Sequence, residues 1–339
     1  MHAGGTMHIR EPRSTLIGLV LVLASASAGR AEPWRFVVTG DSRGVQNGVN
    51  AEILQELAGQ IVSQGAEFVL WTGDLVSGYG NLEVELNYWK ELMQPVYDAG
   101  IGVYPIRGNH DEGDVDAWNR AFSGDYALPQ NGPPGEVNLT WSLVHRNALI
   151  VGLDHYIPDH SFRTDQAWLD AELAANTQPH VFVAGHVPAF KVRHWDCLHC
   201  YPAERDAFWR SLEAAQSRIY FASHDHFYDH MRLDDGDGIE DNDLHQYIVG
   251  TAGAPLYDDG LYNGDNGAWV PQRVHHEQSY GYVMVEIDGN DVTVTWWHRV
   301  GPGQYVLGGD EFHYTAIPEP GAILLSGLGV LLLRRRGRR

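Results

Sequence analysis

The sequence predicts an α/β protein built from layers of mixed β-sheet and helix. Short apolar segments alternate with segments of helical periodicity along most of the chain, which is typical of layered α/β domains. Near the end, residues 282–287 and 292–297 flank the turn-forming triplet Asp288, Gly289 and Asn290. That pattern predicts a hairpin, and its antiparallel strands make the sheets mixed.

The expected elements follow one another at short intervals. Strands are predicted at residues 34–39, 68–72, 103–107, 143–145, 148–153, 181–184, 219–222 and 246–249. One helix is expected to begin after Asn50, a residue type that caps helices, because apolar residues recur after it at helical spacing: Ile53, Leu54, Leu57 and Ile61. Further helices are predicted at residues 82–98, 164–175 and 203–215.

Composition places the chain among globular proteins and restricts its partners. The chain has 339 residues, 44% of them hydrophobic, and a formal net charge of −21. Nucleic acids and anionic membrane surfaces need a positive protein face. We therefore expect no nucleic-acid partner, whereas a carboxylate-rich site would attract metal cations.

The N-terminal residues 1–31 are predicted to be a signal peptide. Arg10 and Arg13 form a basic region, residues 16–24 form an apolar run, and residues 26–28 offer small side chains for cleavage. The mature, exported domain is expected to span residues 32–315.

The C-terminal residues 316–339 have three parts. A Pro-Glu-Pro motif at 318–320 precedes an apolar stretch at 321–333 and an arginine-rich end at 334–339. This order resembles the PEP-CTERM sorting signal of bacteria, which implies processing by an exosortase at the inner membrane. The expected location is then the cell envelope, the surface or the medium. The alternative is a retained transmembrane anchor, with its arginines on the cytoplasmic side.

The two cysteines of the chain, Cys197 and Cys200, are spaced as C-x-x-C. In an exported protein this spacing favours a local disulfide. Free thiols and a metal site that includes the flanking His194 and His199 are the alternatives.

Polar side chains suited to metal binding lie just past the ends of the predicted strands. The carboxyl edge of an open α/β sheet is where ligands bind. The residues are Asp41, Asp74, Asn109, His186, His224 and His226. Such a mixture of oxygen and imidazole ligands suits iron, manganese or zinc, and two ions about 3.5–4 Å apart can hydrolyse a phosphoester.

These clusters resemble the motifs of the calcineurin-like metallophosphoesterase superfamily. Gly-Asn-His-Asp at 108–111 is the most specific of them. His-Phe-Tyr at 226–228 and Gly-Thr-Ala-Gly-Ala-Pro at 250–255 resemble the purple-acid-phosphatase-like branch. The resemblance spans roughly residues 34–297. It implies a four-layer sandwich of two mixed β-sheets flanked by helices, and phosphoester hydrolysis at a centre of two metal ions.

The resemblance also implies a role for each matching residue. Asp74 is expected to bridge the two ions, with Asp41 and His226 completing the first site. Asn109, His186 and His224 would complete the second site, and a metal-bound hydroxide would be the nucleophile. His110 would contact the phosphoryl group and assist the leaving oxygen.

Two positions depart from the family pattern. Block one often reads Asp-x-His, whereas this chain has Arg43 in place of the histidine. The branch also has a tyrosine ligand where Ser77 stands, although Tyr79 lies near. The first metal site is therefore uncertain. Arg43 is expected either to clamp a phosphate through paired hydrogen bonds or to form a structural ion pair, and His194 is a candidate substrate contact.

An acidic run at residues 234–243 contains Asp235, Asp237 and Asp241. Its Asp-x-Asp-Gly spacing resembles the start of a calcium loop, although the full twelve-residue pattern is absent. The run is therefore expected to be either a calcium site at these three aspartates or a solvated acidic loop.

The sequence as a whole predicts an exported metal-dependent phosphoesterase that acts on a small phosphomonoester or phosphodiester. The alternative is a surface-displayed binding protein with a degenerate metal site. A nuclease is disfavoured, because long phosphate chains need positive grooves.

Overall fold

The computed structural model describes residue 1 and residues 32–258, 260 and 267–316. The predicted signal peptide (1–31) and sorting tail (316–339) lie outside the described residues, apart from residues 1 and 316. Within the described ranges, no helix has the length and apolar composition needed to cross a bilayer.

One mixed sheet has six strands. β1, β3 and β4 run parallel, and β12 to β14 add an antiparallel meander beside β1. In spatial order the strands are β14 (Gln304–Thr315), β13 (Asp291–Gly301), β12 (Gly281–Asp288), β1 (Trp34–Thr39), β3 (Phe68–Trp71) and β4 (Gly102–Pro105).

The other mixed sheet has seven strands. β6, β7, β8 and β10 run parallel, while β5, β9 and β11 pair antiparallel at its two sides. The spatial order is β11 (Val270–Glu277), β9 (Tyr228–Asp234), β10 (Leu244–Val249), β8 (Ile219–Ala222), β7 (His180–Gly185), β6 (Ala148–Leu153) and β5 (Trp141–His145). The short strand β2 (Arg43–Gln46) lies outside both sheets and bridges to Val49.

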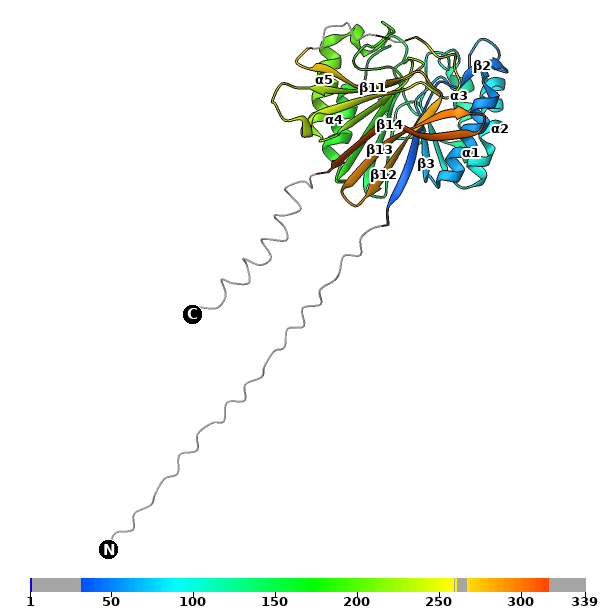
Figure 1. The fold of residues 1–339 in the computed structure, drawn as a ribbon. Helices are drawn as coiled ribbons and strands as arrows, with labels where there is room; N and C mark the ends of the chain where they lie inside the picture. The colour runs from blue at the N-terminus through cyan, green and yellow to red at the C-terminus, as the bar shows by residue number, and fades with distance from the viewer. Residues whose placement is uncertain (2–31, 259, 261–266, 317–339) are drawn as a thin grey trace. The chain divides into compact units, whose positions relative to one another are not determined.

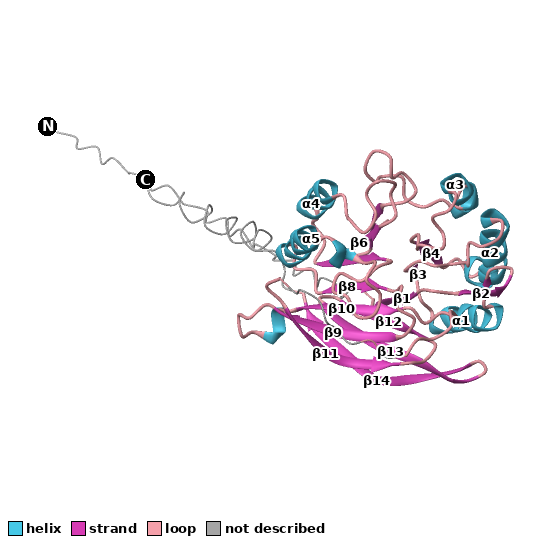
Figure 2. Cartoon of the chain, turned by 90° about the horizontal axis from the view of Figure 1, so that it is seen from above, coloured by secondary structure: helices cyan, strands magenta, loops and turns pink. Residues whose placement is uncertain are grey.

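Helices cover the outer faces of the sheets (Figures 1 and 2). Figure 2 shows α1 (Ala51–Gln64), α2 (Leu82–Asp98) and α3 (Val115–Ala121) on one side. It shows α4 (Gln166–Ala175) and α5 (Pro202–Ala214) on the other. The predicted cap of α1 is confirmed, since the Asn50 side chain accepts a hydrogen bond from the Ile53 amide at 3.4 Å.

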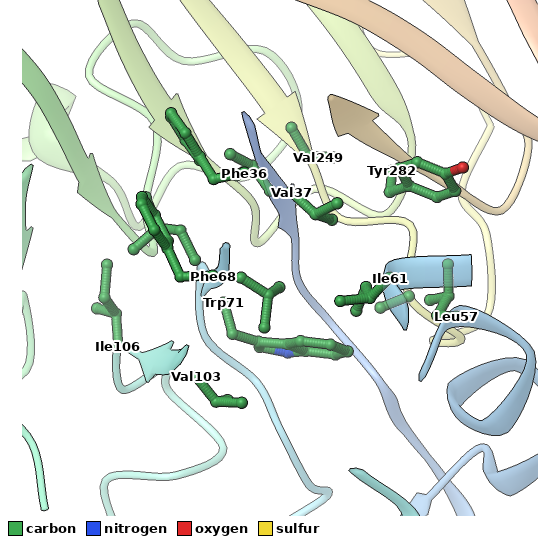
Figure 3. Packing of buried hydrophobic residues seen from close by; sticks show 14 of the residues in the cluster. Phe36, Val37, Leu57, Ile61, Phe68, Trp71, Val103, Ile106, Val249 and Tyr282 are labelled. Atoms are coloured by element: carbon green, nitrogen blue, oxygen red, sulfur yellow. The ribbon is translucent and has the colours of Figure 1, made fainter. Parts of the chain in front are cut away.

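The core explains why the sheets face each other. The Phe36 ring of β1 stacks on Phe68 of β3, with centroids 4.6 Å apart, and meets Phe182 of β7 edge-on at 5.1 Å. Figure 3 shows this cluster, which also takes in Leu57 and Ile61 of α1. Burial of aromatic and branched side chains from all these elements removes a large apolar area from water.

The predicted fold class is confirmed, but among the described α-helices and β-strands five were missed: β2, α3, β9, β11 and β14. β9 is buried although it contains Asp229 and His230. Asp229 pairs with Arg273 and His276 of β11, and His230 with Asp310 of β14. The strand therefore lacks the apolar run that predicts a buried strand.

Candidate metal centre

Loops that follow the parallel strands of both sheets meet at one edge. The Asp41 amide donates to the Gly73 carbonyl at 2.9 Å, and the Ser42 amide to the Asp74 carbonyl at 2.9 Å. The Asp41 carboxylate in turn accepts from the His224 amide at 2.9 Å, which ties β1 to β8 across the two sheets. The sequence prediction that these strand ends lie together is confirmed.

Several residues of these loops have positive φ angles. Asp41, Asp74 and His224 have φ angles of 61°, 50° and 71°, a left-handed conformation that few non-glycine residues adopt. Gly73 has φ of 103°, and a Cβ there would lie 2.3 Å from Nδ1 of His186. Only glycine fits at this position.

Four ligand atoms converge beside Asp74. The Asn109 Oδ1 atom lies 3.2 Å from His186 Nε2 and 3.1 Å from His224 Nδ1, and His186 Nε2 lies 3.5 Å from Asp74 Oδ1. A tetrahedron of ligands about 2.1 Å from a metal ion has edges of roughly 3.4 Å. The three distances that link the four residues predicted for the second metal are therefore close to those that an ion needs.

A polar partner lies on the far side of each imidazole and indicates which ring nitrogen is free. Nδ1 of His186 donates to the Thr72 carbonyl at 2.8 Å, which leaves the Nε2 lone pair facing Asn109. Nε2 of His224 lies 3.3 Å from a carboxylate oxygen of Asp196, which leaves Nδ1 toward Asn109. Such outer partners orient metal-binding histidines.

The residues expected at the first site lie next to the second. Among the described residues, Asp41, Asp74 and His186 bring one ligand atom each within 4.8 Å of one another, so that this group joins the two expected sites. Oδ1 of Asp41 is buried without a hydrogen-bond partner there and lies 3.6 Å from Nε2 of His226. Arg43 also enters this site, with Nη2 3.3 Å from His226 Nε2 and Nε 3.6 Å from Asp74 Oδ2. The donor set of the first site is thus partly taken up by a guanidinium.

Burial governs the ionisation of these groups. Burial and the neighbouring Asp74 raise the pKa of Asp41 well above its ordinary value. Burial lowers the pKa of His186 to about 4, and burial together with Arg43 lowers that of His226 to about 3. Both imidazoles are therefore neutral at neutral pH, as metal ligands must be.

Two groups that the sequence prediction did not assign brace the site. The buried Asp111 carboxylate accepts from the amides of Gly108, Leu75 and Val76 at 2.9–3.3 Å, which joins the loops after β3 and β4. The segment 250–255, recognised only as a family-like motif, donates from its backbone to the carbonyls of Gly40 and Asp41 at 2.8 Å.

Tyr257 is a third group that the sequence prediction did not assign. Its ring stacks on His226 with centroids 4.1 Å apart, and its hydroxyl accepts from Nη2 of Arg43 at 3.1 Å. Only the resemblance of the preceding segment pointed to this region. The departure from the branch's tyrosine at position 77 remains: Ser77 bonds to Glu85 at 3.2 Å, and the nearby Tyr79 is 83% exposed.

His110 lies beside the converging ligands. Its Nδ1 donates to the Ser77 carbonyl at 2.7 Å, and its Nε2 lies 3.9 Å from Asp74 Oδ2. The exposed Tyr79 ring meets it edge-on at 5.4 Å. The Ser77 carbonyl thus fixes Nδ1 of His110, and Nε2 is left beside the candidate metal site.

His194 reaches the same edge from the loop after β7. Its Nδ1 lies 2.5 Å from a carboxylate oxygen of the buried Asp225, and its ring centroid is 4.7 Å from that of His224. The ring is therefore next to the ligands and anchored by Asp225, a contact that no sequence spacing revealed.

The predicted disulfide is absent, because Cys197 and Cys200 are free thiols. Cys197 precedes a turn of 3-10 helix (Leu198–Cys200) that ends at Cys200, and the Cys200 thiol donates to the Trp195 carbonyl at 3.2 Å. Burial raises the pKa of Cys197 to about 12. His199 bonds to Arg205 at 2.8 Å rather than joining the cysteines at a metal.

The acidic loop gathers differently from the predicted calcium set. In the described part of the chain, Asp235 groups with Asp234 and Asp243. Asp237 instead accepts from the Ile239 amide and the Asn242 side chain at 2.6 and 2.8 Å. The combination of Asp235, Asp237 and Asp241 is therefore wrong as a ligand set, because the turn directs Asp237 to its own loop.

Comparison with known proteins now identifies the family. The sequence profile of calcineurin-like phosphoesterases matches residues 35–228, a range that holds all six predicted metal ligands. The chain belongs to the calcineurin-like phosphoesterase family. It is also 26% identical over 324 residues to human tartrate-resistant acid phosphatase type 5, which covers 84% of this chain and 94% of the human protein.

Solved structures agree on the fold of this family member. A purple acid phosphatase from yellow lupin seeds superimposes with a TM-score of 0.64 at 14% identity, over 85% of this chain and 54% of the lupin chain. The anchor in the inner membrane complex of Plasmodium superimposes with a TM-score of 0.60 at 14% identity, over 85% and 89%. The likeness to purple acid phosphatases implies a dinuclear metal centre, for which Asp41, Asp74 and His186 form a candidate site.

Proposed function

We propose that this phosphoesterase-family protein is an exported, metal-dependent hydrolase of small phosphoesters. One observation carries the proposal: oxygen and nitrogen ligand atoms of Asp74, Asn109, His186 and His224 converge at 3.1–3.5 Å beside the imidazole of His110. A metal ion bound there supplies a nucleophilic water near neutral pH and positive charge for the phosphoryl oxygens.

The chain's own residues supply the remaining requirements. Asp74 and the two fixed imidazoles present their lone pairs without rearrangement, because backbone carbonyl and carboxylate partners already hold the rings. Electrostatic groups that are positioned in advance stabilise a transition state without a cost of reorganisation at the moment of reaction.

His110 is placed to assist the leaving group. The Ser77 carbonyl holds Nδ1–H, so that Nε2 faces the space next to Asp74. A protonated Nε2 can pass its proton to the departing oxygen, a contribution that typically accelerates a reaction by about 10²–10⁴-fold.

Phosphomonoesters are the preferred substrate class, and phosphodiesters the second. The human relative is named an acid phosphatase and matches most of this chain. The net charge of −21 disfavours nucleic acid as a substrate, because its phosphates would be repelled.

A second candidate function is ligand binding without catalysis. Arg43 in the first metal site favours it, since the guanidinium takes contacts that a metal would use. The fold also occurs in the Plasmodium anchor protein, so that the fold alone does not establish catalysis.

Export and sorting complete the proposal. The signal-like N-terminus and the PEP-CTERM-like tail support passage through the inner membrane, processing by an exosortase-type enzyme, and a final place in the envelope or medium. The motif order supports this route.

The test is metal analysis coupled to a substrate panel. Purified protein would be assayed against p-nitrophenyl phosphate, alkyl phosphomonoesters and bis-p-nitrophenyl phosphate, with iron, manganese and zinc quantified in the same sample. Turnover with bound metal supports a phosphoesterase, whereas bound phosphoester without turnover supports the binding protein.

A further inference from the structure

The two-metal arrangement and the described residues disagree at the first site. A metal there needs the lone pair of His226 Nε2. The His226 Nδ1 atom donates to the Pro255 carbonyl at 2.8 Å, so that Nε2 is the free acceptor of this ring. Nη2 of Arg43 lies 3.3 Å from that acceptor. The lone pair is therefore used by the guanidinium.

Arg43 also contacts one oxygen of the carboxylate that is expected to bridge the two ions. Its Nε lies 3.6 Å from Asp74 Oδ2, while the other carboxylate oxygen, Oδ1, faces His186. A single guanidinium thus contacts both Asp74 and His226, which are two of the three expected ligands of the first ion. A cation placed between them would meet the fixed positive charge of the arginine.

The guanidinium is held in this position. Arg43 begins β2 and bridges to Val49, and the Tyr257 hydroxyl accepts from its Nη2 at 3.1 Å. The side chain is only 20% exposed. Arginine stays protonated in proteins, so it cannot give way by losing its charge as a lysine can.

We propose that the guanidinium of Arg43 replaces the first metal ion. The centre then holds one ion, at Asp74, Asn109, His186 and His224, next to a permanent organic cation. The inference rests on the proposed function for the reaction itself, but the number of bound ions is independent of turnover.

With Arg43 in place of the first metal, a positive charge still binds the phosphoryl group, but Asp41 no longer has a metal to bind. Among the described residues none accepts a hydrogen bond from Nη1 of Arg43, so its N–H groups remain for a phosphoryl oxygen, which guanidinium binds well. Oδ1 of Asp41, buried without a hydrogen-bond partner in the described structure, then serves as an acceptor for a water in place of a metal ligand.

The test is the number and coupling of bound ions in full-length protein and in two variants. Metal-free protein would be titrated with Mn²⁺ alone, by calorimetry and by electron paramagnetic resonance. The proposal predicts one Mn²⁺ per wild-type chain with the spectrum of an isolated ion. Arg43→His, which restores the Asp-x-His pattern, should bind two ions that give the spectrum of a coupled pair.

Arg193→His is the matched control. Arg193 lies over the Tyr257 ring at 4.6 Å and donates to the Asp258 carbonyl at 2.6 Å, so its loss should leave one ion. Two coupled ions or none in the wild type would overturn the proposal, as would one ion in a folded Arg43→His variant. One ion without hydrolysis of p-nitrophenyl phosphate would leave the proposal standing and refute the proposed function. Two bound ions together with hydrolysis would refute the proposal and support the proposed function.

Discussion

Asp196 lies 3.3 Å from Nε2 of His224, on the side of the ring away from Asn109. Burial alone would lower the pKa of His224, but the hydrogen bond to Asp196 and the charge of Asp225 raise it above its ordinary value. A carboxylate in this position orients a metal-binding imidazole and makes it more basic.

Removal of that carboxylate should weaken metal binding. Asp196→Ala is expected to lower the affinity for the metal about 10–100-fold, with turnover recovered at higher metal concentration. Metal titration of the apo-protein measures the affinity. Glu91→Ala, at an exposed position of α2, is the control. Equal affinities in both variants would show that Asp196 does not support His224.

His110→Ala should separate chemistry from metal binding. Its Nε2 faces Asp74 but completes no ligand set, so the metal content should stay unchanged. Hydrolysis of alkyl phosphates should fall about 10²–10⁴-fold. Hydrolysis of p-nitrophenyl phosphate should fall less, because its leaving group needs little protonation. Parallel losses for both substrates would argue against proton donation.

Gly73→Ala should damage the site through sterics. The new Cβ would meet His186 Nδ1 at 2.3 Å, and φ of 103° is unsuited to alanine. Backbone strain alone costs roughly 1–3 kcal/mol. Gly59→Ala, in α1 with nothing within 4 Å of the added Cβ, should instead stabilise the protein by about 1 kcal/mol. Chemical denaturation should show a lower free energy of unfolding for Gly73→Ala and a higher one for Gly59→Ala.

The stability of the protein should fall in acid partly because of His245. Burial, followed by the charges of His230 and two arginines, lowers the pKa of His245 well below its ordinary value. Below about pH 6.5 the unfolded chain therefore binds one more proton than the folded protein at this residue. The contribution of His245 is fully present above that pH and falls by about 1.4 kcal/mol per unit of further acidification.

His245→Gln should flatten that acid limb of the stability curve. His313→Gln, at a side chain that is 58% exposed on β14, should leave it nearly unchanged. Denaturation midpoints measured from pH 7.5 to 5 give the two slopes. A His245→Gln slope equal to that of the wild type would show that another group causes the acid sensitivity.

The sequence predicted most of the strand ends well because an apolar run is followed there by glycine and a polar residue. Asp41 after β1 and Asp74 after β3 are examples. It missed β9 because Asp229 and His230 are buried in partnerships with residues more than 40 positions away, and such long-range pairing leaves no local pattern.

Within the site, the residues that converge at the candidate metal centre were predicted, whereas the residues that support them were not. Asp196 and Tyr257 lie in loops without periodicity, and only the folded structure brings them to His224 and His226. The predicted disulfide failed for a related reason, since C-x-x-C spacing does not reveal whether the intervening turn brings the two thiols together.

The most direct test of the account follows phosphate release while metal-free protein is reloaded. Chelated protein should release no phosphate from p-nitrophenyl phosphate, and stepwise addition of Mn²⁺ should restore release until about one ion is bound per chain. Full activity in protein shown to hold no metal, or no activity at any metal loading, would contradict a metal-dependent phosphoesterase.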